Sequence, residues 1–408
     1  MLRQNAWKLC IWGVEWGTVP VGRCLVEEIV LNRREFLRKL GKAGVAVTAG
    51  GALSASFPRR AGAAPGGAPK LIRLHGSPKT MGRQYAEQAG DLVRERLKLM
   101  KEKGTHVPMD LVEQSRIFLN VKANSVLVEI EYLASTLEVK EEDLLVLSAE
   151  PPGVGIRRGG CSSFVIDPKA ATDGHVWAGE NIDDTSDLER FGVVILRHPM
   201  DSPPMITWAL AGGVGAIGMN LKGIVVLMNY VQTVKKRPPV GIFPEFVANS
   251  ALRQSEFKDA SAVIAHTPIM GPCAFTVADA EGTRVMLERT AHIFRGMTPG
   301  ALCACHTNHF LDRELQTEDE THKVFPNSKG RLKRLNRMLD RKDITLDRMK
   351  KVLADTQDEP NGICRTAEPP TIASVLMCPR KNIMLALRGR PDREKYQEFT
   401  LTREPERE

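Results

Sequence analysis

The sequence changes character at Cys161, and this change constrains the fold more than any other feature. Before it, residues 80–149 contain long runs of helix-forming residues with few breakers. From Cys161 onward the chain falls into short β-branched and apolar runs bounded by Gly, Asp and Pro, which is typical of strands in a largely antiparallel sheet. The sequence therefore predicts an α-rich front segment followed by a β-rich body.

Individual elements can be predicted within both parts. In the front segment we expect a strand at 71–74 and helices at 80–103, 110–137 and 139–149, the first with Ser77 as N-cap and Pro78 at its first position. In the body we expect strands at 162–166, 176–178, 193–197, 205–210, 223–228, 275–278 and 285–287, and a strand pair within 373–387. The expected helices there are 244–253, 258–266, 328–341 and 345–355. This order favours an α+β fold with helix, sheet, sheet and helix layers.

Residues 1–64 have the pattern of an export leader. Arg33-Arg34 precede Phe36-Leu37, and the Gly- and Ala-rich stretch 43–57 follows, as in a twin-arginine signal. That stretch is shorter than the ~20 apolar residues of a membrane span, and a basic amphipathic surface helix would contain larger apolar residues. The Ala61-Gly62-Ala63 pattern suits signal cleavage after Ala63. We expect the twin-arginine translocase as a partner during export, a periplasmic or extracellular location, no stable membrane anchor, and translation starting downstream of residue 1.

The leader also explains most of the net charge. The chain carries a formal net charge of +8, and residues 1–64 hold 10 Lys and Arg against 4 Asp and Glu. Residues 65–408 therefore carry only +2, with 47 basic and 45 acidic residues. A nearly neutral mature chain argues against nucleic acid as a partner.

Export changes the expectation for the cysteines. Cys10 and Cys24 leave with the leader, and six remain at positions 161, 273, 303, 305, 364 and 378. In an oxidising compartment they could form at most two disulfides if one thiol is kept for chemistry. Cys303 and Cys305 lack the further ligands of a zinc site, so we predict no bound metal and no cofactor.

Gly159-Gly160-Cys161 is the candidate reactive junction. A cysteine thiol at this place can attack the carbonyl of the preceding residue, and Gly160 minimises crowding there. Cleavage would give Cys161 a free α-amine, whose pKa near 7.7–8.0 suits a general base beside the thiol. The alternative is a buried cysteine that only packs at the start of a strand.

The surrounding motifs resemble those of the autoprocessed N-terminal-nucleophile amide hydrolases grouped with acyl-coenzyme A:6-aminopenicillanic acid acyltransferase. They are more distantly similar to those of penicillin V acylases, bile-salt hydrolases and acid ceramidase. The resemblance rests on the order and spacing of segments 76–82, 161–164, 172–183, 218–223, 278–282, 306–310, 328–331 and 371–375. It implies the four-layer αββα fold of N-terminal-nucleophile hydrolases.

The resemblance also implies roles for individual residues. Cys161 would be the nucleophile, exposed by cleavage after Gly160, and Asp183 would orient its amine. Asn229 and Asn308 would donate hydrogen bonds to the tetrahedral oxyanion. Arg331 would border the site. Turn or strand-end positions are the alternatives for Asp183 and the two asparagines, and a solvated basic face of a helix is the alternative for Arg331.

Some positions depart from the family pattern. Glu180 stands where the bile-salt hydrolase branch has an arginine next to the nucleophile, so the charge of that pocket does not transfer. Ala274 stands where close relatives often have asparagine. His306 and His309 suggest a Cys–His pair, but the mechanism implied by the resemblance needs no histidine base.

The sequence thus predicts an exported, self-cleaving cysteine amide hydrolase or acyltransferase that acts on a linear, non-peptide acyl amide. Its parts would be a leader (1–64), an α-rich segment (65–160) and a catalytic body (161–408), with the two mature fragments remaining associated. Scarce coenzyme A outside the cytoplasm favours hydrolysis over acyl transfer. The alternatives are an uncleaved, non-catalytic binding protein of the same fold and, from the export signal, a protein folded around a redox cofactor.

Overall fold

The structure is a computed structural model that describes residues 10–11, 14–15, 67–104, 107–149, 160–233 and 241–405. The chain divides into two compact units, Met1–Ala61 and Gly62–Glu408. In the first unit β1 (Cys10–Ile11) and β2 (Val14–Glu15) pair antiparallel. The predicted twin-arginine pair, the signal cleavage site after Ala63 and the residues 150–159 before the junction lie outside the described residues.

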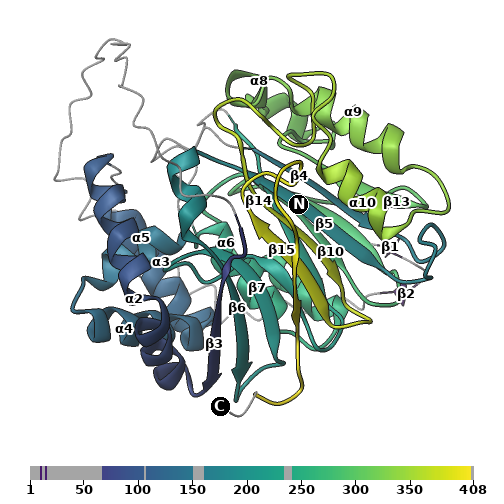
Figure 1. Ribbon diagram of the computed structural model, residues 1–408. Helices are drawn as coiled ribbons and strands as arrows, with labels where there is room; N and C mark the ends of the chain where they lie inside the picture. Colours follow the sequence, from purple (N-terminus) through teal and green to yellow (C-terminus); the bar gives the residue numbers. More distant parts are fainter. Residues whose placement is uncertain are drawn as a thin grey trace, which may run out of the picture. The chain divides into compact units, whose positions relative to one another are not determined.

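Two sheets of the second unit pack face to face (Figure 1). The eight-stranded sheet has the order β12-β11-β10-β9-β8-β7-β6-β3, and the six-stranded sheet has the order β13-β4-β5-β14-β15-β16. In the first sheet the bounds are β3 (Lys70–Gly76), β6 (Gly192–Pro199), β7 (Met205–Leu210), β8 (Ile217–Asn220), β9 (Val225–Tyr230), β10 (Cys273–Ala278), β11 (Arg284–Arg289) and β12 (Phe294–Met297). In the second they are β4 (Cys161–Ile166), β5 (Trp177–Asp183), β13 (Cys303–His306), β14 (Thr371–Cys378), β15 (Ile383–Arg388) and β16 (Gln397–Thr400). Neighbouring strands are antiparallel except β3 and β6.

Helices cover the outer faces of both sheets. On the eight-stranded sheet lie α2 (Pro78–Glu102), α6 (Pro244–Leu252) and α7 (Phe257–His266), and α3 (Met109–Lys122), α4 (Asn124–Leu137) and α5 (Glu141–Ala149) pack with α2 and with one another. On the six-stranded sheet lie α9 (Ser328–Leu339) and α10 (Leu346–Leu353), and α8 (Thr321–Val324) precedes them. Short 3-10 helices are η1 (Ser186–Phe191) and η2 (Leu315–Glu318). The predicted α+β fold with four αββα layers is confirmed.

Most predicted elements are present with small shifts at their ends. Ser77 caps α2 and accepts the N–H of Thr80. The predicted helix at 110–137 is divided at Ala123 into α3 and α4. The sequence did not predict β8, β12, β13 or β16, all of which are four residues long. In β8, Gly218 weakens the strand signal, yet a Cβ there would lie 2.4 Å from the Ile206 carbonyl oxygen.

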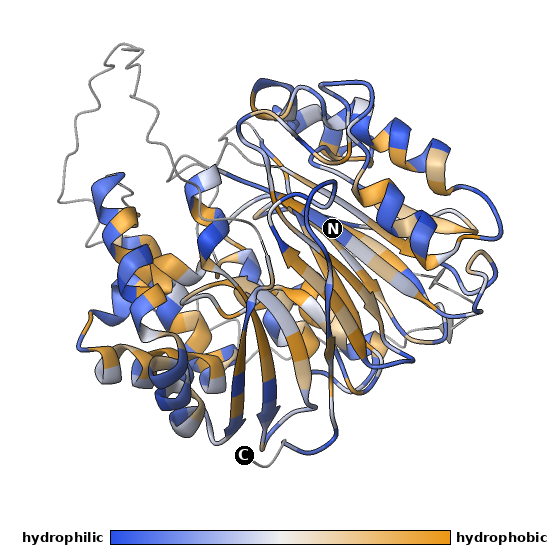
Figure 2. Ribbon diagram, in the orientation of Figure 1, coloured by the Kyte–Doolittle hydropathy of each residue, from blue (hydrophilic) through white to orange (hydrophobic). Residues whose placement is uncertain are grey.

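The core consists of two main apolar clusters, and Figure 2 shows strands that are mostly hydrophobic. The larger cluster extends from helices α2 to α7 across the eight-stranded sheet to the space between the sheets, and the smaller one lies under α9 and α10. Alternate residues of β4 face opposite sides. Val165 belongs to the layer between the two sheets, whereas Phe164 belongs to the layer under α9 and α10. By the same alternation Cys161 and Ser163 face the other sheet. None of the described helices is both long and apolar enough to cross a membrane.

Gly82 is expected to be essential for the packing of α2 on α4. A Cβ at this position would lie 2.4 Å from the Glu129 carbonyl oxygen and 2.9 Å from the Leu133 nitrogen, both rigid backbone atoms. Gly82→Ala should therefore lower the free energy of unfolding by about 1–3 kcal/mol in urea titrations. Gly90→Ala in the same helix is the control. Its Cβ would meet chiefly the movable tip of Leu137, and the helix gains up to about 1 kcal/mol of propensity. An equal change in the free energy of unfolding for Gly82→Ala and Gly90→Ala would contradict the proposed close packing at Gly82.

Candidate active site

Cys161 lies at the wall of a cavity in the second unit. It is the first residue of β4 and is 7% exposed. The cavity has a volume of about 70 Å³, which is small beside the usual small-molecule site. It is lined by Arg96, Leu147, Ser148, Cys161, Ile182, Asp184, Trp208, Ala209, Leu210, Gly213, Gly215, Ala216, Ile217, Met228, Tyr230 and Glu245. The front segment and the body thus both contribute to its wall.

The peptide bond between Gly160 and Cys161 is held from both ends. The Gly160 carbonyl oxygen accepts the main-chain N–H of Asp183 at 2.7 Å. The Cys161 N–H donates to Oδ1 of Asn308 at 2.9 Å. A Cβ at position 160 would lie 2.6 Å from that Oδ1 and 3.0 Å from the Arg331 guanidinium. Only glycine therefore fits before the cysteine in this arrangement.

Arg331 connects three segments at the junction. It is fully buried on α9, and its guanidinium donates to the Cys161 carbonyl oxygen at 2.6 Å, to Ser162 Oγ at 2.7 Å and to Asn308 Oδ1 at 2.7 Å. Burial lowers the pKa of Arg331 to about 10, although nearby Asp183 opposes the shift. The side chain thus stays charged at neutral pH.

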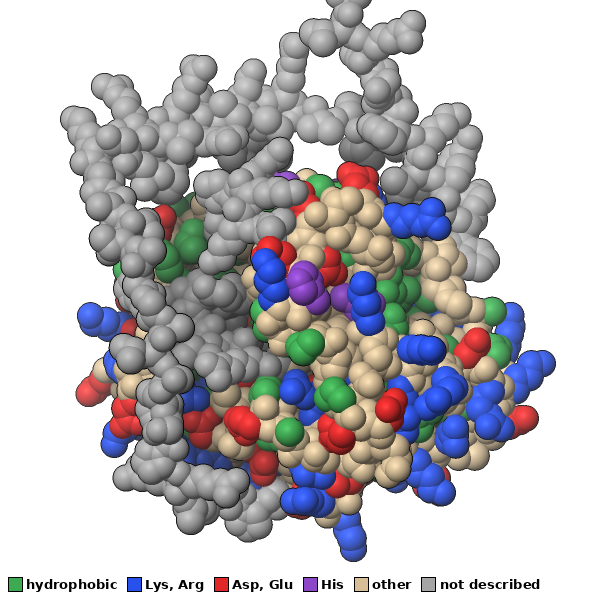
Figure 3. Space-filling model, turned by 90° about the horizontal axis from the view of Figure 1, so that it is seen from above, with side chains coloured by type: hydrophobic (Ala, Val, Ile, Leu, Met, Phe, Trp, Pro, Cys, Tyr) green, Lys and Arg blue, Asp and Glu red, His purple; other side chains and the backbone are tan. Residues whose placement is uncertain are grey.

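The alternative of a solvated basic face does not apply to Arg331. On the same helix Arg334 pairs with Asp355, and Arg337 is exposed. Lys and Arg side chains gather along one side of the surface seen in Figure 3. The basic pattern of α9 therefore describes its outer face, whereas Arg331 points inward to the junction.

Asp183 ends β5 beside the junction. Its Oδ1 accepts the hydroxyl of Thr371 at 2.7 Å, and its Oδ2 has no partner among the described residues. Burial raises the pKa of Asp183 to about 6, and the charges of Arg331 and Arg365 oppose this shift. A carboxyl with an open oxygen at this place can accept a further N–H or O–H donor.

The two asparagines use their amides differently. Asn229, which lies within β9 and not after a strand, accepts the Ser163 hydroxyl on Oδ1 at 2.6 Å. Its buried Nδ2 has no partner among the described residues. Nδ2 of Asn308 donates to the Tyr230 carbonyl oxygen at 2.9 Å. Asn229 therefore has an open amide donor, whereas Asn308 mainly holds the Cys161 backbone.

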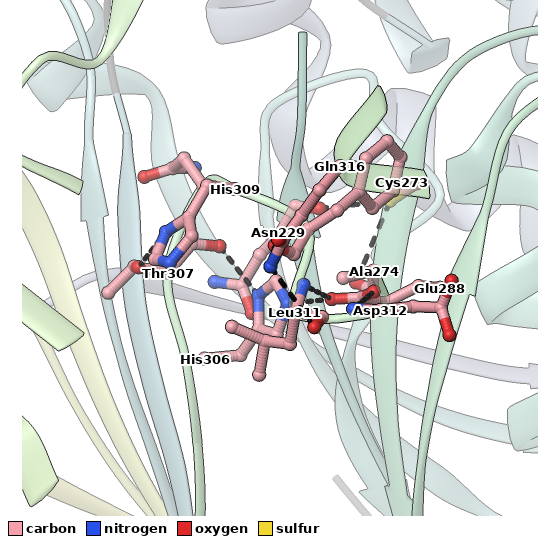
Figure 4. A network of polar contacts seen from close by, with 12 residues as sticks. Asn229, Cys273, Ala274, Glu288, His306, Thr307, His309, Leu311, Asp312 and Gln316 are labelled. Carbon is pink, nitrogen blue, oxygen red and sulfur yellow. Dashed lines mark hydrogen bonds and ion pairs between the residues drawn. The ribbon is translucent and has the colours of Figure 1, made fainter. Parts of the chain in front are cut away.

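The histidines do not form a pair with Cys161. His306 Nε2 lies 2.8 Å from Oε1 of Glu288, which also accepts N–H groups of Leu311 and Asp312 (Figure 4). His309 Nδ1 contacts Ser328 Oγ at 2.8 Å, and burial lowers its pKa to about 4. Neither histidine lines the cavity.

Glu180 and Ala274 occupy the two positions that depart from the family pattern. Glu180 is fully buried, and its Oε2 accepts the Met228 N–H at 3.4 Å. Burial raises the pKa of Glu180 well above its ordinary value, and hydrogen bonds with Met228 and the Cys161 side chain only partly offset this. Ala274 on β10 is the register partner of Asn229 on β9 and of Glu288 on β11. The side chain between these two polar residues is therefore only a methyl group.

The cysteines at positions 161, 273, 303, 305, 364 and 378 are all free thiols, which is within the expected limit of two disulfides. Cys303 and Cys305 are two residues apart on β13, and the Cys305 thiol lies 3.7 Å from the Cys303 sulfur. The described residues contain no group of three or more His, Cys, Asp or Glu placed to hold a metal ion.

Sequence reasoning missed several residues that support the site. Thr371 is the first residue of a motif quoted for the family resemblance, so a signal for it existed. Ser328 likewise begins such a motif and accepts the Asn308 N–H at 2.8 Å. Ser163 lies within the quoted motif 161–164, whereas Glu288 had no signal of its own, because its partner His306 comes from another strand.

The family model described as acyl-coenzyme A:6-aminopenicillanic acid acyl-transferase matches residues 176–393, more than half of the chain. The match includes Asp183, Asn229, Asn308 and Arg331 and begins after Cys161. No curated protein matches the chain.

Solved structures match at low identity. A mutant of conjugated bile acid hydrolase from Clostridium perfringens is 13% identical, over 60% of this chain and 97% of that one, with a TM-score of 0.36. Penicillin V acylase from Agrobacterium tumefaciens is 13% identical, over 55% of this chain and 82% of that one, with a TM-score of 0.35.

Arg331→Met should destabilise the fold strongly. It leaves the buried acceptors at Cys161, Ser162 and Asn308 without their charged donor, which we expect to cost about 3 kcal/mol or more. Urea unfolding of chains that also carry Cys161→Ala, so that each stays in one piece, measures the effect. Arg337→Met on the exposed face of α9 is the matched control and should stay within about 0.5 kcal/mol of the parent. A similar small effect of both changes would show that Arg331 does not connect these segments.

Proposed function

The chain belongs to the acyl-coenzyme A:6-aminopenicillanic acid acyl-transferase family, and on this premise we propose that it is an exported, self-cleaving cysteine amide hydrolase. The observation that carries the proposal is the geometry at Gly160–Cys161. A thiol, a carbonyl with a donor on its oxygen and an acceptor on the scissile N–H are together at one peptide bond. These are the groups that an intramolecular acyl shift requires.

Self-cleavage would begin with attack of the Cys161 sulfur on the Gly160 carbonyl carbon. The negative charge that develops on the carbonyl oxygen would be stabilised by the Asp183 main-chain N–H, and one such donor is worth roughly 3 kcal/mol of barrier. The thiol proton passes to the Cys161 nitrogen as the C–N bond breaks, leaving a thioester. Water then releases the Gly160 carboxyl and frees the thiol and the α-amine of Cys161.

The same groups would serve the mature enzyme. The α-amine of Cys161 would stay near Asn308 Oδ1 and act as the base for its own thiol, with Asp183 orienting it. The thiol would attack the substrate carbonyl, and the open Nδ2 of Asn229 is the candidate donor to the oxyanion. Asn308 can contribute through the second N–H of its amide. The amine product would leave with the proton, and water would hydrolyse the thioester.

The cavity supports a linear acyl amide as substrate. Its wall is largely apolar, with Leu147, Trp208, Ile217 and Met228 among its residues, and this suits an acyl chain. Cys161 lies at that wall, so the carbonyl of such a substrate could reach the sulfur. Water is the proposed acceptor of the acyl group, because acyl-coenzyme A is scarce outside the cytoplasm.

The two fragments would remain associated after cleavage. Helices α2 to α5 share one apolar layer with the sheets of the body. Arg96 and Leu147 from the front segment line the same cavity as Cys161. Separation would expose this layer and open the cavity.

Wild-type protein should be found as two fragments that part between Gly160 and Cys161, as seen by denaturing gel and intact mass. Cys161→Ala should give a single chain, because the nucleophile is absent. Cys305→Ala, which removes another buried thiol of the same sheet, should be cleaved like wild type. Gly160→Ala should be cleaved at least about tenfold more slowly, since its Cβ would displace Asn308.

The decisive comparison is between wild type and Cys161→Ala. An unclipped wild-type chain, or cleavage that persists in Cys161→Ala, would refute self-cleavage by this residue. A panel of N-acyl amides that differ in acyl length, assayed on the processed protein, then tests hydrolysis directly.

Export is tested separately. Replacing Arg33 and Arg34 by lysine should retain the protein in the cytoplasm of the producing cell, because the twin-arginine translocase reads this pair. Fractionation followed by immunoblotting measures the distribution. Replacement of Arg59 and Arg60 by lysine is the control and should leave export intact. Equal export of both variants would argue against a twin-arginine signal.

A further inference from the structure

Glu180 lies next to the nucleophile on the same face of the six-stranded sheet. Cys161 pairs with Ile182, and Ser163 pairs with Glu180 in the antiparallel register of β4 and β5. Paired residues share a face of the sheet, and so do residues two apart on one strand. Glu180 is therefore the diagonal neighbour of Cys161, a separation that a long side chain can span. In the resting state the Cys161 thiol donates to this carboxyl, which lowers the pKa of Glu180, and once the thiol has lost its proton only the carboxyl can be the donor between the two groups.

The surroundings of this carboxyl do not favour a negative charge. Glu180 is fully buried, and its Oε1 has no partner at ordinary hydrogen-bond distance among the described residues. The groups that face it are the Cys161 thiol from β4, the Met228 N–H from β9, Asp183 from its own strand and the Cys273 thiol from β10. No Lys, Arg or His of the described chain pairs with it. Burial and Asp183 raise the pKa of Glu180 well above its ordinary value, and a buried carboxyl with no cation beside it among the described residues favours the neutral form.

A protonated carboxyl beside a nucleophilic sulfur has a definite chemical use. The thiolate that forms during catalysis is itself buried, and a buried anion needs a hydrogen-bond donor. Ser163 cannot supply one, since its hydroxyl donates to Asn229. The O–H of Glu180 is then a donor on the correct face, and it stabilises the thiolate without adding a charge to the cavity.

We propose that Glu180 is a further catalytic residue, which in its protonated form donates a hydrogen bond to the Cys161 sulfur and stabilises the thiolate. The inference rests on the proposed function, because it adds a residue to that same site. No bond is made or broken by Glu180, and its proton stays on the carboxyl throughout. The role differs from that of an arginine at this position, which would bring a permanent positive charge to the sulfur.

The test measures the thiolate without a substrate. The full chain is prepared with Glu180, with Glu180→Gln, which keeps a neutral donor of the same shape, and with Glu180→Met, which keeps the length but has no donor. The rate of alkylation of Cys161 by iodoacetamide is followed from pH 5 to 10 by intact mass and peptide mapping. Cys161→Ala gives the background from the other thiols. Circular dichroism and thermal unfolding verify that each variant is folded.

The expected result separates the two variants. Glu180→Gln should react within about threefold of wild type at every pH. Glu180→Met should react about tenfold more slowly near neutral pH, with its profile displaced by about one pH unit to the alkaline side. Faster alkylation of Glu180→Gln by about tenfold would show that Glu180 is ionised in the wild type, and the proposal would be wrong. An unchanged profile in Glu180→Met would equally overturn it.

Failure of this inference can be distinguished from failure of the proposed function. Cleavage at Gly160 is scored on the same samples by intact mass. An uncleaved wild-type chain would contradict self-cleavage, whereas alkylation of its thiol would still decide whether Glu180 donates to the sulfur. If Glu180→Met does not fold, the comparison of wild type with Glu180→Gln decides alone.

Discussion

The buried guanidinium of Arg331 is the contact on which the arrangement at Cys161 depends. A charged group without access to water is tolerated only where acceptors surround it. Here they are the Cys161 carbonyl oxygen, Ser162 Oγ and the Asn308 side chain, which belong to the start of β4 and to the loop after β13. Since α9 contributes the arginine, one side chain fixes a helix, a strand and a loop around the Gly160–Cys161 bond. The fit is tight enough to exclude a side chain at residue 160.

A second constraint is the polar layer between the two sheets. His306, Ser163 and Glu180 form a row across one sheet and face Asn229 and Glu288 of the other. The Ser163–Asn229 and His306–Glu288 pairs are satisfied, and buried pairs of this kind fix how the sheets are placed. Two groups of this layer are left open among the described residues, namely Oε1 of Glu180 and Nδ2 of Asn229. Open polar groups in a buried layer are costly, and in the proposed function both would act on the reacting groups.

The sequence alone predicted the order of the helix and sheet layers and the position at which the α-rich segment gives way to the β-rich body, because both follow from local patterns. The change of texture at Cys161 predicted the first strand of the body, and Gly160 was expected to minimise crowding around its own carbonyl. The sequence could not predict contacts between residues that lie far apart in the chain. Thr371 holds Asp183 from 188 residues away, and β13 consists of four residues whose pairing with β4 no local pattern reveals. The number of disulfides could only be limited to two from the sequence, because pairing depends on distances between strands, and the six thiols of the body are free.

The order of events in the proposed function follows from where the site residues lie in the chain. Asp183, Asn308 and Arg331, which hold the Gly160–Cys161 bond, all come after it in sequence. The hydrogen bonds to the Gly160–Cys161 peptide unit can therefore form only after the body has folded and α9 has packed on β4. Cleavage would leave the Asn308 and Arg331 contacts in place, because they are made to the backbone of Cys161 and not to its thiol, whereas the Asp183 N–H bonds to Gly160 on the other side of the cleaved bond. The new α-amine would then appear already bound to Asn308, with the sulfur beside Glu180. In the proposed function the fold would thus complete the site before cleavage releases the α-amine of Cys161, and an unfolded chain would lack the groups that promote the cleavage.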